Sequence, residues 1–171
     1  AILHWFFPSS LLPWLAAAAG LAAANADTWA TELGILSSKE PILITNGKTV
    51  PPGTSGGISR AGTLAAIAGA ILVAGVFFAL SPGQNASMAN QARWGLSAVV
   101  ALSGLAGNLV DSLLGATLQA VYYCPSCQKE TEKHPLHDCG TSTHWVRGWH
   151  WLNNDWVNVA CTSSAALLGV V

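Results

Sequence analysis

Charged side chains are scarce in this sequence. Its 171 residues include only seven Lys and Arg and eight Asp and Glu, which is 9% of the chain, against roughly 25% in a typical soluble domain. A soluble protein of this length needs a charged surface, and this composition does not supply one. Hydrophobic residues make up 51% of the chain, and the mean hydropathy is +0.44. The sequence therefore predicts an integral membrane protein.

The sequence also lacks a strong net charge and a conventional beginning. A formal net charge of −1 excludes the basic footprint of a nucleic-acid-binding protein. The first residue is Ala1 rather than Met, and no positively charged leader precedes the first apolar stretch. We expect the chain to begin inside a longer membrane protein, with further helices upstream.

Long apolar stretches predict an all-α polytopic membrane protein. A helix that crosses a bilayer needs about 20 mostly apolar residues. Gly62–Leu80 carries no charge, and Trp94–Val121 carries only Asp111. We expect about four transmembrane helices in a single membrane domain, a fragment of a longer bundle, over residues 2–24, 62–80, 94–121 and 151–171.

Basic residues divide unevenly between the loops that join these helices. If the helices alternate, residues 35–61 and 122–150 lie on one side of the membrane and residues 81–93 on the other. The first two loops hold Lys39, Lys48, Arg60, Lys129, Lys133 and Arg147, and the third holds only Arg93. The positive-inside rule therefore predicts that loops 35–61 and 122–150 are cytoplasmic.

The loop over residues 35–61 is expected to contain a short hairpin. Asn46-Gly47, the strongest signal for a two-residue turn, is flanked by Pro41–Thr45 and Lys48–Val50. Hydroxyl residues and glycines then fill Thr54–Thr63, just before a helix. Free backbone N–H groups and the positive end of a helix dipole suit phosphate. The alternative is a flexible lead with a Ser or Thr cap, and no Gly-Lys-Ser/Thr of a Walker loop follows.

Acidic residues occur inside the third predicted helix and just beyond the end of the first. Asp27 and Glu32 lie near the cytoplasmic end of the first, and Asn108 and Asp111 share one face of the third. Asp111 lies roughly 15 Å before the expected helix end at Val121, at about 1.5 Å per residue. A carboxylate at that depth costs at least about 2.5 kcal/mol unless it is paired, metal-bound or hydrated. The alternatives are a structural Asp between helices and, for Asp27 and Glu32, a helix end in water.

Amides and a carboxylate open the last helix, at Asn153, Asn154, Asp155 and Asn158. Oxygen ligands of this kind suit Mg²⁺, although a helix cap between interfacial tryptophans is the alternative. The sequence thus has four polar groups, near residues 25–34, 54–63, 107–116 and 151–158. We expect all four to reach the same face of the membrane, each from a different helix. Their agreement predicts a phosphate-and-metal site at that face.

A separate set of soft ligands lies in the loop over residues 122–150. Cys124 and Cys127 form a Cys-x-x-Cys pair, followed by His137 and Cys139. This set suits tetrahedral zinc, with His134 as the alternative to His137. Cytoplasmic placement argues against disulfides, and a metal would fold a loop too short to form a core. We expect a small structural zinc-binding loop, with free or redox-active thiols as the alternative.

Four stretches of this sequence together resemble one known family. They are Asn25–Gly34, Gly53–Ser59, Gly107–Ala116 and Leu152–Asp155. They resemble, in order and over about residues 20 to 160, the integral membrane family once called domain of unknown function 92. That family includes animal transmembrane protein 19 and the plant phytyl-phosphate kinase of vitamin E synthesis. The resemblance implies phosphoryl transfer from a nucleoside triphosphate to an isoprenoid (phytyl or polyprenyl) monophosphate in the bilayer.

This implied reaction suggests roles for the polar residues, because phosphoryl transfer depends on positioning and on charge neutralisation by Mg²⁺. Mg²⁺ is expected on Asp27, Glu32, Asp111 and Asp155, oriented by Asn108, Asn154 and Asn158. Phosphate is expected on Thr54, Ser55, Gly56 and Gly57, assisted by Lys48 or Arg60. The lipid tail would lie between the helices. The cysteine loop is not a general feature of the family and leaves the substrate open.

Two other functions fit the same residues. Intramembrane carboxylates also mark ion pathways, so an ion-coupled transporter is the principal alternative. An enzyme would consume nucleotide in detergent, whereas a carrier would show only flux across vesicles. The third possibility is a non-catalytic scaffold whose zinc loop binds a partner, for which Asp111 would not matter.

Overall fold

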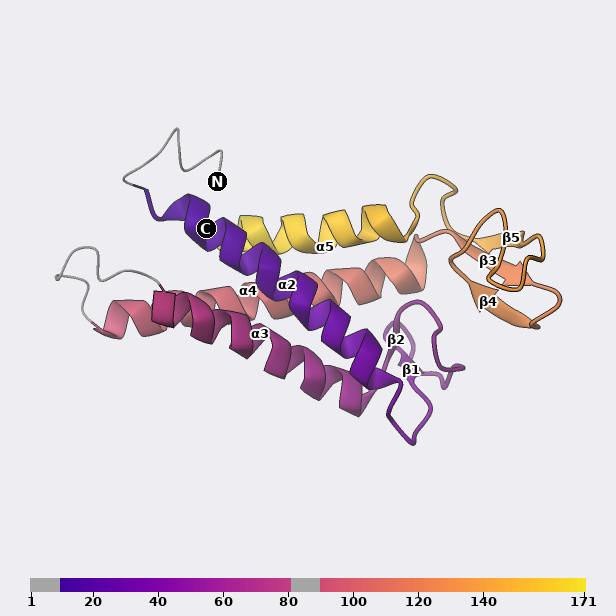
Figure 1. Cartoon of the computed structure of the whole chain (residues 1–171), viewed down its shortest axis with the longest axis horizontal. Helices are drawn as coiled ribbons and strands as arrows, with labels where there is room; N and C mark the ends of the chain where they lie inside the picture. The colour runs from indigo at the N-terminus through magenta and orange to yellow at the C-terminus, as the bar shows by residue number, and fades with distance from the viewer. Residues whose placement is uncertain (1–9, 81–89) are drawn as a thin grey trace.

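A computed structural model describes residues 10–80 and 90–171 of the chain. Within them, four helices form an elongated bundle: α2 (Leu12–Gly34), α3 (Arg60–Leu80), α4 (Asn90–Thr117) and α5 (Asn154–Leu168). Two small sheets lie at one end of the bundle, beyond the last turns of α2 and α4 (Figure 1). The two loops predicted to share a side therefore lie at the same end. Residues 2–9 of the first predicted helix and residues 81–89 of the loop after α3 lie outside the described residues.

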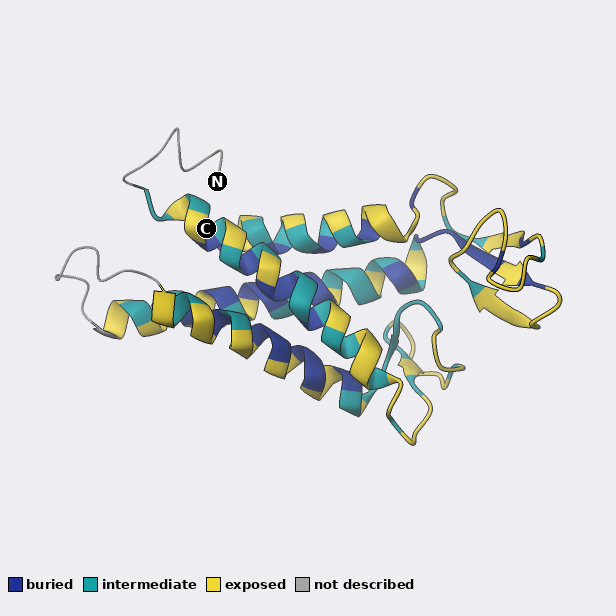
Figure 2. Cartoon of the chain, viewed as in Figure 1, coloured by how far each residue is buried: buried dark blue, intermediate teal, exposed yellow. Residues whose placement is uncertain are grey.

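Small residues fill much of the interior of the bundle, and many large apolar residues face outward. The buried residues of α3 are all Gly or Ala: Gly62, Ala65, Ala66, Gly69, Ala70 and Ala74. On the same helix, Leu64 is 68% exposed and Ile71 is 58% exposed. The outer faces of the helices are exposed along much of the bundle (Figure 2). A soluble protein buries its large apolar residues, so this reversed pattern is typical of helices packed in lipid.

Two glycines allow α4 to approach its neighbours closely. A Cβ atom on Gly104 would lie 2.6 Å from the Cβ of Ala22 on α2. A Cβ atom on Gly107 would lie 2.7 Å from the carbonyl oxygen of Cys161 on α5 and 2.8 Å from the Cβ of Ala23. Small residues at such spacing let helix backbones pack tightly. This packing brings the polar residues of α2, α4 and α5 to one another.

Among residues 10–80 and 90–171, two helices are long and apolar enough to cross a membrane. They are α3, Arg60–Leu80, and residues Gln91–Thr117 of α4. Helix α2 has 23 residues but carries polar side chains in its second half. Helix α5 has 15 residues, or roughly 22 Å at about 1.5 Å per residue, less than the roughly 30 Å of a hydrocarbon core. Crossing by α2 and α5 therefore stays a prediction.

The ends of three helices differ from the expected ones. Helix α2 continues to Gly34 rather than ending at residue 24, and the Thr28 hydroxyl donates to the Ala24 carbonyl within it, at 2.8 Å. Asn25 and Asp27 form hydrogen bonds to Gly69 of α3 and Asn108 of α4, so these polar residues do not end the helix. Helix α4 stops at Thr117, before Val121, because Val121 begins a strand. Helix α5 begins at Asn154, where the Asn153 side chain caps it.

The loop after α2 forms the expected hairpin with a different turn. Backbone hydrogen bonds join Leu43 N to Lys48 O at 2.8 Å and Val50 N to Pro41 O at 3.0 Å. The turn therefore spans residues 44–47, and the prediction of a two-residue Asn46-Gly47 turn is wrong. Gly47 still supplies a left-handed conformation, at φ 68°. The short strand β1 (Ile42–Leu43) also pairs, antiparallel, with β2 (Gly57–Ile58), which holds the glycine-rich segment against the hairpin.

Residues 121–147 fold into a small sheet, which we call the knuckle. Strands β3 (Val121–Cys124), β4 (Lys129–Thr131) and β5 (His144–Arg147) are antiparallel in the order β4-β3-β5. Arg147 Nη1 donates to the carbonyl oxygens of Gly115 and Ala116, at 3.2 and 3.1 Å. The chain is mostly helical, but this sheet was not expected in an all-α chain.

Candidate functional site

A cavity of about 640 Å³ opens at the end of the bundle that carries the loops. All four described helices and both loop regions contribute to its wall. The described residues that line it include ten of the residues predicted from sequence: Asp27, Glu32, Thr54, Ser55, Gly56, Gly57, Asn108, Asp111, Asn154 and Asn158. The cavity thus unites residues that lie far apart in the sequence.

Two carboxylates face each other in this cavity. Asp27 of α2 and Asp111 of α4 lie close enough for a direct side-chain interaction. Asn108 Nδ2 donates to Asp27 Oδ1 at 3.2 Å. The Oδ1 atom of Asp111 is buried and has no hydrogen-bond partner among the described residues. Adjacent carboxylates repel unless they share a proton or a cation, so this pair is suited to bind a cation.

Glu132 is a further carboxylate at the cavity, besides Asp27, Glu32 and Asp111, and sequence did not predict it. It follows strand β4 and lies near enough for its charge to act on both Asp27 and Asp111. Ser55 Oγ donates to Glu132 Oε1 at 2.6 Å. In sequence, Glu132 lies among other charged residues of a polar loop, and no spacing distinguishes it. Only the folded position of the knuckle brings it to the cavity.

The glycine-rich segment Thr54–Gly57 rests on the C-terminal end of α4. Gly56 has φ 78°, and a Cβ atom there would lie 2.4 Å from the Cβ of Ala116. No other residue fits so close to the helix in that conformation. The cap proposed as the alternative is also present, since Ser59 Oγ accepts a hydrogen bond from Gly62 N at 3.0 Å. Ser59 therefore caps α3, whereas Thr54–Gly57 lines the cavity.

Three predicted residues are not on the cavity wall. Lys48, Arg60 and Asp155 are exposed and do not line it. The basic residue on the wall is instead Lys39, and Gln119 is a further polar residue there. Gln119 is 2% exposed, and its Nε2 atom has no partner among the described residues. Neither residue carried a signal in the sequence, because both depend on how the loops pack on α4.

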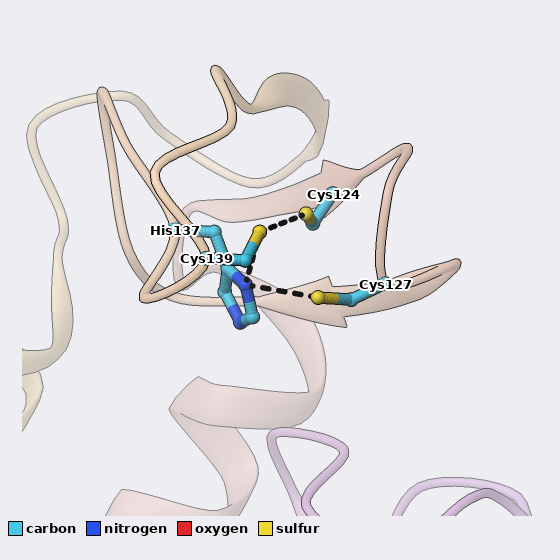
Figure 3. Close-up of side chains that lie close together, drawn as sticks. All are labelled: Cys124, Cys127, His137 and Cys139. Carbon is cyan, nitrogen blue, oxygen red and sulfur yellow. Dashed lines mark hydrogen bonds between the residues drawn. The ribbon is translucent and has the colours of Figure 1, made fainter.

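The four predicted zinc ligands converge in the knuckle (Figure 3). One ligand atom from each of Cys124, Cys127, His137 and Cys139 lies within 4.8 Å of the others. Cys124 Sγ is 3.5 Å from Cys139 Sγ, and His137 Nδ1 is 3.4 Å from the sulfurs of Cys127 and Cys139. A tetrahedral zinc site has ligand separations of roughly 3.5–3.8 Å. The cluster can therefore hold a metal ion.

The alternative ligand His134 lies outside this cluster. Its ring stacks on Tyr122, with 4.4 Å between the ring centroids. Its Nδ1 atom is 3.4 Å from the hydroxyl of Thr143. Of the two histidines, His137 is the one that faces the cysteines.

Hydrogen bonds divide the protons unequally among the thiols. A hydrogen bond with the hydroxyl of Thr141 and a second one with His137 lower the pKa of Cys139 to about 5. Contact with Cys139, above all, raises the pKa of Cys127 to about 11. Zinc binds thiolates, so at neutral pH Cys139 is ready to bind a metal, and Cys127 loses a proton when a metal binds.

Comparisons with known proteins agree with a membrane location. The family model described as "Integral membrane protein DUF92" matches residues 1–166. Protein PGR of Arabidopsis thaliana is 39% identical over 80% of this chain and 46% of its own length. An uncharacterized membrane protein of Methanocaldococcus jannaschii is 39% identical over 58% of this chain and 37% of its own. Protein VTE6, chloroplastic, of Arabidopsis thaliana is 30% identical over 85% of this chain and 33% of its own. The chain thus spans less than half of each relative, and no solved structure matches it.

Proposed function

The chain belongs to the DUF92 family of integral membrane proteins, and on that premise we propose that it is part of a membrane-embedded prenyl-phosphate kinase. The proposed reaction transfers a phosphoryl group from a nucleoside triphosphate to an isoprenoid monophosphate. The observation that carries this proposal is the carboxylate pair Asp27 and Asp111 beside the glycine-rich segment Thr54–Gly57, in one cavity at the loop end of the bundle.

The donor set in the cavity fits Mg²⁺. Mg²⁺ prefers a few carboxylates together with substrate phosphates and water, and the unpartnered Oδ1 atom of Asp111 is an available oxygen. Asp27 and Asp111 would hold the ion, Asn108 would orient Asp27, and Glu32 offers a further carboxylate on the wall. When bound, Mg²⁺ would neutralise charge on the transferred phosphoryl group.

The shape of the cavity fits a substrate with a charged head and an apolar tail. Its polar wall carries Lys39 and the glycine-rich segment, which suit a phosphate group. Its apolar wall includes Ile67, Leu105 and Leu109. Ile67 is 37% exposed and Leu109 is 52% exposed, so a tail leaving the cavity along them would reach lipid. In this arrangement Lys39 replaces Lys48 and Arg60 as the basic residue near phosphate.

The knuckle has a structural role in the same proposal. Cys124, Cys127, His137 and Cys139 would hold Zn²⁺ with all four positions filled by protein, which is typical of structural zinc. Few other residues of the knuckle are buried, among them Tyr122 and Thr143. The ion would therefore supply much of its stability.

The test is an assay of product. Purified full-length protein in detergent is incubated with Mg²⁺, phytyl or geranylgeranyl monophosphate, and each common nucleoside triphosphate. The proposal expects the prenyl diphosphate, formed only with nucleotide and Mg²⁺. Absence of product with every nucleotide and chain length, from protein shown to be folded, would contradict it.

An ion-coupled carrier is the second candidate. It is favoured by one observation: a buried carboxylate oxygen without a partner, on a helix long enough to cross the membrane. Such a carrier would move ions or substrate across sealed vesicles without consuming nucleotide. Flux without turnover would replace the kinase proposal by this one.

A further inference from the structure

The knuckle is docked onto the same structure that forms the cavity. Arg147 binds the last carbonyl groups of α4, and Glu132 accepts a hydrogen bond from Ser55. Behind this contact, the Cα atom of Gly148 lies so near Gln119 that a Cβ atom would meet its carbonyl oxygen at 1.9 Å. The knuckle therefore has a fixed position against both α4 and the glycine-rich segment.

The position of Glu132 depends on the Cys/His cluster. Cys124 ends β3, Cys127 lies in the turn that follows, and Cys124 pairs with Lys129 at the start of β4. Glu132 comes directly after β4, so the hairpin that delivers Glu132 is the hairpin that carries two of the four ligands. With few buried residues of its own, this hairpin lacks a core to hold it once the cluster is opened.

The glycine-rich segment is held from two sides. On one side, Ile44 N donates to Gly56 O at 3.1 Å, from the hairpin of residues 41–50. On the other side, Ser55 Oγ donates to Glu132 Oε1 at 2.6 Å, from the knuckle. The second contact is a hydrogen bond to a charged acceptor, which is roughly twice as strong as a neutral one. Without it, the segment keeps only its attachment to the hairpin and its packing on α4.

From these contacts we propose that Glu132 is a positioning residue, which couples a metal ion held by Cys124, Cys127, His137 and Cys139 to the glycine-rich segment at the cavity. Metal binding orders the β3–β4 hairpin, the hairpin places Glu132, and Glu132 fixes Ser55. The segment is then shaped to receive an anion. The coupling itself is independent of the reaction; only its consequence for substrate rests on the proposed kinase function.

Hydrogen exchange measured by mass spectrometry tests the coupling without any need for turnover. Full-length protein in detergent is compared with and without bound zinc, and exchange is followed in peptides covering residues 51–59. We expect zinc removal to increase exchange several-fold in these peptides as well as in the knuckle. Unchanged exchange over residues 51–59, while the knuckle loses protection, would overturn the proposal.

Three variants separate positioning by Glu132 from a general effect of loop charge. Glu132→Ala removes the acceptor, so exchange over residues 51–59 rises with zinc still bound, and zinc removal adds no further rise there. Glu132→Gln keeps an acceptor oxygen for Ser55 and restores low exchange. Glu130→Ala, at an exposed position on β4 two residues before Glu132, leaves exchange unchanged. Equal exchange in Glu132→Ala and Glu130→Ala would contradict the proposal.

Kinetics then connect the coupling to substrate. If the kinase function holds, Glu132→Ala raises KM for the prenyl monophosphate about tenfold with a smaller change in kcat, and Glu132→Gln restores KM. A loss of kcat at unchanged KM would overturn the positioning role. If no turnover exists, the exchange experiment still decides the coupling, so the two proposals fail separately.

Discussion

The side-chain amide of Asn108 on α4 donates a hydrogen bond to the carboxylate of Asp27 on α2, with 3.2 Å between Nδ2 and Oδ1. The contact forms where Gly104 and Gly107 bring α4 against α2. It fixes the orientation of one of the two carboxylates that face each other in the cavity. Close helix packing and site geometry therefore depend on the same turns of α4.

Replacing Asn108 by Leu keeps a side chain of similar size and removes this donor. Asp27 then loses the partner that orients it toward Asp111. Partners that orient metal ligands typically contribute 10–100-fold in affinity or activity. We expect the Mg²⁺ concentration for half-maximal turnover to rise by about that factor, measured by Mg²⁺ titration of the kinase assay. An unchanged Mg²⁺ dependence in a folded variant would show that Asn108 does not act through the cation.

The packing of α4 is tested by a matched pair of glycine substitutions. Gly107→Ala places a Cβ atom 2.7 Å from the Cys161 carbonyl oxygen, and overpacking of this kind costs about 1–3 kcal/mol. A Cβ atom on Gly95, an exposed position on the same helix, meets nothing within 4 Å. We expect Gly107→Ala to lower the thermal unfolding midpoint in detergent and Gly95→Ala to leave it equal or higher, since Ala favours helix over Gly. Equal midpoints would contradict the packing described for α4.

Metal content distinguishes the two histidines of the knuckle. We expect about one zinc ion per chain by elemental analysis of the purified protein. His137→Ala should lose most of it, because the ring nitrogen of His137 lies 3.4 Å from two of the cysteine sulfurs. His134→Ala should keep it, because His134 stacks on Tyr122 outside the cluster. Zinc retained by His137→Ala and lost by His134→Ala would mean that the ligand set is wrong.

Gln119 is expected to lower the stability of the substrate-free protein and to strengthen binding of the prenyl monophosphate. Its buried Nε2 atom has no partner among the described residues, and an unsatisfied buried donor costs about 1–3 kcal/mol. Gln119→Met removes the donor at similar volume, so unfolding of the substrate-free protein should occur at an equal or higher temperature. The shift in that temperature on adding prenyl monophosphate should become smaller. A lower midpoint with an unchanged substrate shift would assign Gln119 a structural role instead.

Local chemistry made the convergence of Cys124, Cys127, His137 and Cys139 predictable from sequence. Cys124 and Cys127 lie close in the chain, as do His137 and Cys139, so the fold has to bring only two short segments together. The convergence of Asp27, Asn108 and Asp111 could also be predicted, because each lies near the same end of its helix. The choice between His134 and His137 needed the structure, because the spacing allows both.

Other parts of the site depend on features that sequence does not contain. Asn154 and Asp155 are neighbours on α5, and successive side chains on a helix point about 100° apart, so only Asn154 reaches the cavity. Glu132 and Lys39 reach it through the packing of the two loops on the ends of the helices. Lys48 and Arg60 do not: Lys48 follows the turn of residues 44–47, Arg60 is the first residue of α3, and both are exposed. Helix rotation and loop docking are tertiary properties, and periodicity alone does not determine them.

The most direct test of the central claim is the rate of prenyl diphosphate formation by the full-length Asp111→Asn variant. The matched control is Glu40→Gln, a neutralised carboxylate at an exposed position that does not itself line the cavity. The kinase account predicts that Asp111→Asn lowers kcat by at least about 100-fold, typical of a lost electrostatic contribution to the transition state, while Glu40→Gln turns over like the wild type. Wild-type turnover by folded Asp111→Asn protein would contradict the account.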